Sequence, residues 1–99
     1  MLNKDLNGTL TSWKDAATRV FGYSPEEMIG ASILKLIPEY LHSDERTTLE
    51  DIRAGRRIEH FKTVRFAKDG RLVDMSLIVS PVNDEEGRVI EESKILRDV

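Results

Sequence analysis

Cysteine is absent from this chain of 99 residues. The absence excludes disulfides, thiolate zinc sites, cysteine nucleophiles and any photochemistry that proceeds through a cysteine adduct. Long apolar runs are also missing: none approaches the roughly 20 residues that span a bilayer, and residues 1–5 lack the apolar stretch of an export signal. We therefore expect a cytoplasmic protein that does not insert into a membrane.

Charge of one sign is not in large excess either. The 15 basic and 18 acidic residues are well mixed and give a net charge of −3. Such a surface does not concentrate nucleic acid, so we expect no nucleic-acid partner. The 6 glycines stand singly at expected turns and helix ends and form neither a P-loop nor a dinucleotide fingerprint.

The first half of the chain predicts a hairpin followed by short helices. Asn7-Gly8 is a turn signal before a β-leaning run over residues 9–13. Residues 15–21 have helical periodicity, and a capping box at residues 24–27 opens a second helix of barely two turns, which Gly30 ends. A single helical turn is expected at residues 33–37.

A longer helix is expected from about Ser43 to Ala54, with Leu49 and Ile52 as its only apolar stripe. Three strands then follow: residues 57–66, a strand after the turn at residues 68–71, and residues 89–99. The middle strand alternates apolar and polar residues, and Pro81 fits an edge or terminal position. This order predicts an α+β fold, a single antiparallel sheet with helices packed on one face.

The residues that form these expected elements resemble a PAS domain of the kind found in bacterial or archaeal sensor histidine kinases, and the resemblance extends over almost the whole chain. The matching segments are Asp5-Leu6-Asn7-Gly8, Thr11-Ser12-Trp13, Ala16-Ala17, residues 21–30, Leu36-Ile37-Pro38, Gly55-Arg56-Arg57, Lys68-Asp69-Gly70, Ser80-Pro81-Val82 with Asp84 and Gly87, Ser93-Lys94-Ile95 and Arg97-Asp98.

The resemblance implies a five-stranded antiparallel sheet with several short helices on one face and a small apolar cavity between them. Relatives use that cavity for haem, flavin, another chromophore or a metabolite, or leave it empty, so the cofactor here stays unknown; neither haem nor flavin is supported by the sequence. Residues 1–99 are expected to be one PAS domain whose first strand is truncated and whose C-terminal signalling helix is absent.

Besides the truncated first strand, two departures from the PAS pattern stand out. Lys14 stands where the family usually has a helix-capping Asn, so Ser12 or Asp15 would have to help cap that helix. Glu91 and Glu92 stand where small residues are common; a glutamate that points inward would polarise the pocket, and one that points outward would only decorate the sheet.

The two histidines, His42 and His60, are expected to be structural. His42 precedes the predicted long helix, and the position that aligns with the axial histidine of haem-binding relatives is Glu45. His60 and its neighbour Glu59 should point to opposite faces of a strand and cannot act as a ligand pair.

The resemblance implies a ligand pocket bounded by apolar residues of the helices and the sheet. Its expected members are Phe21, Met28, Ile33, Leu36, Ile37, Ile52, Phe61, Met75, Leu77 and Ile95. Ile58, Val64 and Phe66 are expected on one face of their strand and Phe61 on the other, so the outer face is apolar enough to meet a partner.

The expected function is a sensory module that binds a small ligand or a partner and regulates a linked effector, a histidine kinase, a cyclase or a transcription regulator. The expected partners are a second copy in a homodimer, the flanking signalling helices, the effector domain and a small apolar ligand. The alternative is a ligand-free PAS module for dimerisation or protein interaction. A small enzyme that uses His42 or His60 ranks last, and we expect no catalysis in this chain.

Overall fold

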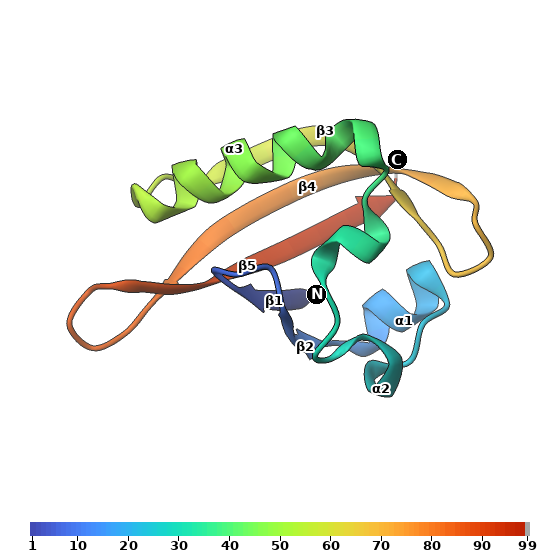
Figure 1. Ribbon diagram of the computed structural model, residues 1–99, viewed down its shortest axis with the longest axis horizontal. Helices are drawn as coiled ribbons and strands as arrows, with labels where there is room; N and C mark the ends of the chain where they lie inside the picture. Colours follow the sequence, from blue (N-terminus) through green and yellow to red (C-terminus); the bar gives the residue numbers. More distant parts are fainter. Residues whose placement is uncertain (99) are drawn as a thin grey trace.

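The computed structural model describes residues 1–98, so the final residue of the predicted last strand, Val99, lies outside the described residues. Its centre is an antiparallel sheet of five strands in the spatial order β2-β1-β5-β4-β3 (Figure 1). The strands are β1 (Leu2–Asp5), β2 (Leu10–Trp13), β3 (Ile58–Phe66), β4 (Leu72–Asn83) and β5 (Val89–Asp98).

The segment between β2 and β3 supplies all the helices of the described chain. They are α1 (Asp15–Phe21), α2 (Pro25–Met28), the 3-10 turns η1 (Ile33–Leu36) and η2 (Glu39–Leu41), and α3 (His42–Arg53). Helix α3 runs along the long strands β3 and β4, while α1 and α2 lie at the end where β2 leads into them (Figure 1). The predicted α+β fold, with one antiparallel sheet and short helices on one face, is confirmed.

The turn between β1 and β2 is fixed by Asp5, whose Oδ1 accepts hydrogen bonds from the backbone N–H groups of Asn7 and Thr9. Gly8 adopts a φ of +88°, a conformation that favours glycine, and its carbonyl accepts a hydrogen bond from Ile33 N at 2.8 Å. The predicted turn therefore forms, and it also holds η1 against the start of the sheet.

The predicted capping box opens α2. Ser24 Oγ accepts from Glu27 N at 3.2 Å, and Glu27 Oε1 accepts from Ser24 N at 3.0 Å. The helix ends at Met28 after one turn, sooner than predicted, because the chain turns back toward β2: Gly30 N donates to the carbonyl of Leu10.

Helix α1 forms over the predicted residues although its N-cap, Lys14, makes no side-chain capping hydrogen bond. The indole of the preceding residue, Trp13, anchors this segment: its Nε1 donates to Thr18 Oγ1 at 3.1 Å and to the carbonyl of Tyr23 at 3.0 Å. These bonds join the end of β2 to the middle of α1 and to the chain just beyond its C-terminal end.

Strand β3 contains an irregularity that the sequence did not reveal. Ile58 pairs with Val79 but Phe61 pairs with Leu77, so two residues of β3, Glu59 and His60, face one residue of β4, Ile78, and His60 takes a φ of +54°. Ile58 and Phe61 therefore share the helix-covered face. The prediction that they occupy opposite faces is wrong, because it assumed unbroken alternation.

Proline is accommodated in β4 although that strand lies inside the sheet. The pairing with β3 extends only as far as Val79, so Pro81 has a ladder partner on one side alone, Glu92 of β5. The strand is locally an edge there, as the proline predicted.

One cluster of buried side chains fills the space between the sheet and the helices. Its members are Leu2, Leu10, Trp13, Ala17, Phe21, Met28, Ile33, Leu36, Ile37, Ile52, Met75, Leu77, Val79 and Leu96. Within residues 1–98, no helix has both the length and the apolar character needed to cross a membrane.

Candidate functional site

Five ionisable side chains are buried where α3 faces β1, β3 and β5. They are Lys4, Glu45, Arg65, Glu92 and Lys94, here called the charged cluster, and none is more than 7% exposed. Charged groups are seldom buried unless they are paired, so this cluster is the most unusual feature of the core.

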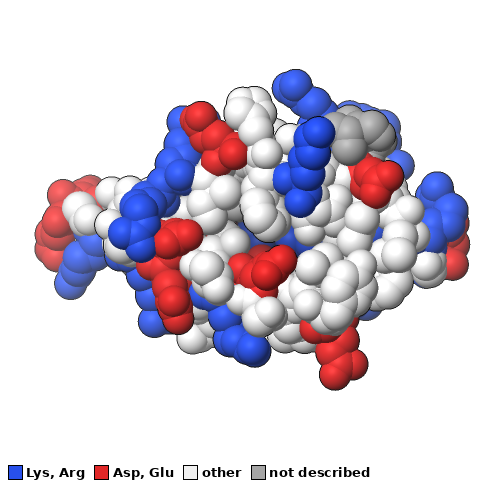
Figure 2. Space-filling model, turned by 90° about the horizontal axis from the view of Figure 1, so that it is seen from above, with Lys and Arg blue, Asp and Glu red and all other residues white. Residues whose placement is uncertain are grey.

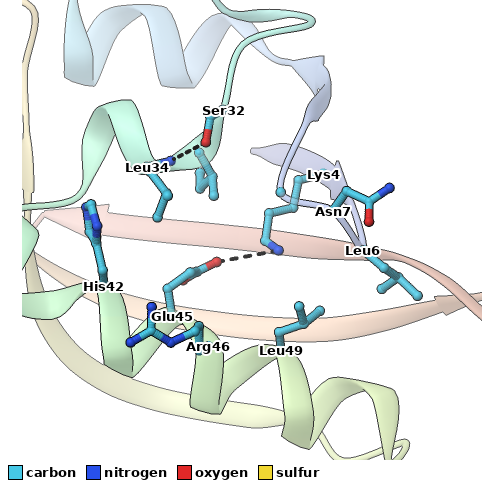
Figure 3. Close-up of a pocket in the computed structure, with 11 residues that line it drawn as sticks. Lys4, Leu6, Asn7, Ser32, Leu34, His42, Glu45, Arg46 and Leu49 are labelled. Atoms are coloured by element: carbon cyan, nitrogen blue, oxygen red, sulfur yellow. Dashed lines mark hydrogen bonds and ion pairs between the residues drawn. The ribbon is translucent and has the colours of Figure 1, made fainter.

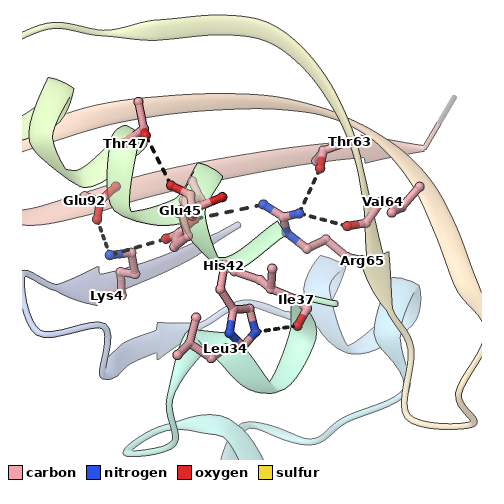
Figure 4. Close-up of polar contacts among 12 residues, drawn as sticks. Lys4, Leu34, Ile37, His42, Glu45, Thr47, Thr63, Val64, Arg65 and Glu92 are labelled. Carbon is pink, nitrogen blue, oxygen red and sulfur yellow. Dashed lines mark hydrogen bonds and ion pairs between the residues drawn. The ribbon is translucent and has the colours of Figure 1, made fainter. Parts of the chain in front are cut away.

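Glu45 lies at the centre of the charged cluster (Figure 4). Its Oε1 accepts a hydrogen bond of 2.5 Å from Lys94 Nζ and lies 3.5 Å from Lys4 Nζ. Its Oε2 lies 4.0 Å from Arg65 Nη2. Lys4 also forms an ion pair with Glu92, so the cluster is one connected network across three strands and one helix.

Strand alternation explains why these charges point inward. On β5, Glu92, Lys94 and Leu96 all lie on the buried face because they are two residues apart. Lys4 of β1 is the register partner of Glu92, so the two side chains leave the sheet side by side. Glu92 is thus the inward glutamate and Glu91 is not, which resolves the alternatives left by the sequence.

Helix α3 contributes Glu45 through its buried face. That face consists of Glu45, Thr48 and Ile52, spaced three and four residues apart. The predicted apolar stripe of Leu49 and Ile52 is wrong in part, since Leu49 is only half-buried and the first turn of the buried face is ionic.

Burial and ion pairing oppose each other in the charged cluster. Burial raises the pKa of Glu45, but Lys94, Lys4 and Arg65 together outweigh it, so the net pKa of this carboxyl is lowered and it stays ionised. Burial lowers the pKa of Arg65, and the nearby carboxylates of Glu45 and Asp44 act against that.

A cavity of about 210 Å³ opens above the charged cluster, between the β1–β2 turn, η1 and α3 (Figure 3). Lys4 and Glu45 form its charged wall, and His42 and Arg46 lie at the side where α3 begins. Leu6, Asn7, Gly8, Ser32, Ile33, Leu34 and Leu49 complete the lining. The cavity is mostly apolar, with a cationic and an anionic group at its base.

Local hydrogen bonds hold the walls of this cavity. Ser32 Oγ accepts from Leu34 N at 3.1 Å and begins η1. His42 Nε2 donates to the carbonyl of Ile37 at 2.9 Å, which fixes the ring against the end of the same turn. The side chains that line the cavity therefore lie on anchored segments.

The predicted pocket residues are only partly brought together. Eight of them are buried in the apolar core: Phe21, Met28, Ile33, Leu36, Ile37, Ile52, Met75 and Leu77. Of these, Ile33 alone lines the cavity above the charged cluster. Their role in binding stays a prediction.

Two of the predicted pocket residues lie elsewhere. Ile95 is 47% exposed on the outer face of the sheet, because Lys94 and Leu96 on either side of it point inward. Phe61 is on the helix-covered face but 36% exposed, in a shallow groove beside Thr48 of α3.

The sequence analysis missed the charged cluster, although a signal for it was present. Period-two alternation places Glu92 and Lys94 on the face of Leu96, and it places Lys4 on the face of Leu2. Charges at inward positions predict partners, but the identity of the partners required the three-dimensional packing of α3 on the sheet.

The two histidines lie apart and on different faces. His42 borders the cavity, whereas His60 lies beside Ile95 and Arg97 on the outer face of the sheet. Among the described residues, no three His, Asp or Glu side chains gather as metal ligands.

The cavity above the charged cluster is smaller than the roughly 300–1,000 Å³ of sites for drug-sized molecules, so the residues present do not fit haem or flavin.

These observations define the class of the protein: a small α+β domain whose antiparallel sheet and short helices enclose an apolar core beside a ligand-sized cavity. A family model described as PAS fold matches residues 1–99. The chain belongs to the PAS fold family. PAS domains are in general sensory modules and are typically not catalytic.

Solved structures agree with this assignment. The PAS domain of a protein from Colwellia psychrerythraea superposes with a TM-score of 0.89 at 20% identity, over 99% of this chain and 83% of that one. The PAS domain of an HTR-like protein from Haloarcula marismortui gives 0.82 at 22% identity, over 99% and 78% of the two chains.

The dark structure of the blue-light photoreceptor Aureochrome1 LOV gives a TM-score of 0.81 at 16% identity, over 99% of this chain and 73% of that one. At these identities the likeness shows the fold alone. No curated protein matches the sequence.

Proposed function

We propose that this PAS domain is a cytoplasmic signal-transduction module that binds a small ligand and regulates a linked effector, a histidine kinase, a cyclase or a transcription regulator. The observation that carries the proposal is the cavity that shares Lys4 and Glu45 with the charged cluster. A ligand there would contact groups that are themselves bonded to the centre of the sheet.

The route for a signal follows the same contacts. Glu45 bonds to Lys94 of β5, and the next residue, Ile95, lies on the outer face of the sheet opposite Ile78 of β4. A ligand that binds one arrangement of the charged cluster more tightly than another would shift the population of sheet conformations. A flanking helix or a second copy of the domain on the outer face would then detect the change.

Native mass spectrometry and an absorption spectrum of the protein as purified test the proposal. A stoichiometric extra mass that is lost on denaturation supports ligand binding, and a visible band would identify a chromophore. An unliganded mass, together with no thermal shift across a metabolite panel, contradicts the proposal and favours the alternative.

The alternative is a ligand-free module for dimerisation or protein interaction. The observation that favours it is the apolar character of the outer face, where Ile95 is 47% exposed and Ile78 lies beside it. Sedimentation velocity of wild type and Ile95→Glu tests this: a dimer that the glutamate dissociates supports association through this face. A monomer in both proteins contradicts it.

A further inference from the structure

The charged cluster is not electrically balanced. Its buried members, among the side chains of residues 1–97, are three basic groups, Lys4, Arg65 and Lys94, and two carboxylates, Glu45 and Glu92. The exposed Asp44 also interacts with Arg65, but it lies at the surface, where water weakens its effect. A surplus of positive charge in a low-dielectric interior is unfavourable, so a negative group brought to the cluster would be stabilised.

The cavity is the place where such a group can reach the cluster. Lys4 is the cation of the cluster that lines it. The carboxylate of Glu45 also faces the cavity, but both of its oxygens are already engaged: Oε1 by Lys94 and Lys4, and Oε2 by Arg65. Lys4 is in turn paired with Glu92, so the base presents one cation and one carboxylate to the cavity, and the surplus of positive charge belongs to the charged cluster as a whole.

Arg46 adds a positive charge at the entrance of the cavity. Arg46 is exposed and forms no ion pair with the side chains that the structure describes, while lining the cavity from the first turns of α3. His42, on the same side of the cavity, donates through Nε2 to the carbonyl of Ile37. The surface around α3 is otherwise a mixture of basic side chains, blue in Figure 2, and acidic side chains, red in the same view.

The remaining walls of the cavity are apolar, so they favour a ligand whose body is apolar. Leu6, Leu34 and Leu49 surround the space beside Lys4 (Figure 3), and Ile33 also lines the cavity. An apolar cavity of about 150 Å³ accepts benzene. The volume here, about 210 Å³, therefore accommodates a ring or short chain of that size together with one carboxylate.

We propose that the cavity binds a small monocarboxylate with an apolar body of about the size of benzene, its carboxylate beside Lys4 and its body against Ile33, Leu34 and Leu49. This inference rests on the proposed function and names the chemical class of its ligand. The net charge of −3 and the mixed basic and acidic side chains on the face seen in Figure 2 give no general attraction for anions, so the proposed preference is assigned to the cavity.

The test is a titration of the protein, monitored by two-dimensional amide NMR, with three small aromatic compounds that are similar in shape and differ in charge. Benzoate carries the proposed charge, benzamide is neutral and benzylammonium is cationic. We expect benzoate to shift the amides of residues 4–8, 32–34 and 42–49 saturably, and to bind at least about tenfold more tightly than benzamide, as a charge-assisted hydrogen bond would give.

Variants separate the cavity from general effects. Arg46→Gln removes an exposed charge and should fold normally, weakening benzoate about three- to fivefold without changing benzamide. Lys4→Met should weaken benzoate at least about tenfold; because Lys4 is buried, its fold is checked by the same spectra. The matched control, Arg19→Gln on α1, should leave both affinities unchanged.

The outcomes distinguish this inference from the proposed function. Benzamide or benzylammonium that binds as tightly as benzoate overturns the anionic preference. Saturable benzoate binding that is unaffected in Arg46→Gln and Lys4→Met overturns the site. If native mass spectrometry finds a neutral or cationic ligand, the proposed function stands and this inference fails; if it finds none and no probe binds, both fail.

Discussion

Glu45→Gln is the substitution that tests the charged cluster most severely. The amide keeps the shape of the side chain but removes the charge that faces Lys94, Lys4 and Arg65. Breaking a buried ion pair by removing one partner typically costs about 3–5 kcal/mol, because the remaining charge stays buried without compensation. A domain of this size has a total stability of about 5–15 kcal/mol, so the loss should be large.

Urea unfolding measures this loss. The fluorescence of Trp13, which is 5% exposed, reports the tertiary structure, and far-ultraviolet circular dichroism reports the helices and strands. With a dependence on urea of about 1–3 kcal/mol per molar, the midpoint should fall by at least about 1 M. The control is Glu50→Gln on the exposed side of α3, which should change stability by less than about 0.5 kcal/mol.

A second substitution sharpens the test. In Glu45→Gln combined with Lys94→Gln, the lysine that loses its partner is also removed, so part of the stability should return relative to Glu45→Gln alone. A loss below about 1 kcal/mol in the single variant, or no recovery in the double variant, would refute the reasoning, because the carboxylate would then be solvated rather than buried and paired.

Three further predictions concern pH, a helix cap and the two faces of the sheet. The pKa of the Glu45 carboxyl is lower in the folded protein than its ordinary value of 4.5, so the stability that this carboxylate contributes is present above pH 4.5 and is lost as the pH falls through the folded pKa. Urea midpoints measured from pH 7 to pH 3 should therefore fall less steeply in Glu45→Gln than in wild type. Parallel curves for the two proteins would contradict this. Ser24→Ala removes the cap of α2 and should lower stability by about 1 kcal/mol in thermal unfolding, whereas an unchanged midpoint would show that the cap contributes nothing. Leu77→Ala, at a position 1% exposed, should cost about 2–5 kcal/mol, and Ile95→Ala less than about 0.5 kcal/mol; similar costs would mean that the faces are wrongly assigned.

The local elements could be predicted because their signals lie within a few residues. The turn at Asn7-Gly8, the capping box at Ser24 and the alternation from Val73 to Val79 each specify one conformation by short-range chemistry. Their order along the chain was then enough to indicate one antiparallel sheet with helices on one face.

The site could not be predicted to the same degree because it depends on long-range packing. Glu45 and Lys94 are 49 residues apart in sequence, and nothing local to either residue reveals the other. The bulge at His60 also reversed the face of the residues before it, so the face of Ile58 relative to Phe61 could not be predicted from alternation. Apolar residues of the core were therefore assigned to the pocket, whereas the cavity combines other apolar side chains with the charged groups of Lys4, Glu45 and Arg46.

The central claim is that the cavity and the centre of the sheet are coupled through the charged cluster. Amide hydrogen exchange with and without saturating benzoate measures this directly. The account predicts slower exchange around the cavity, at residues 4–8 and 42–49, and also along β5 at residues 91–97, where Glu92 and Lys94 lie. Slower exchange confined to the cavity walls, with residues 91–97 unchanged, would contradict it.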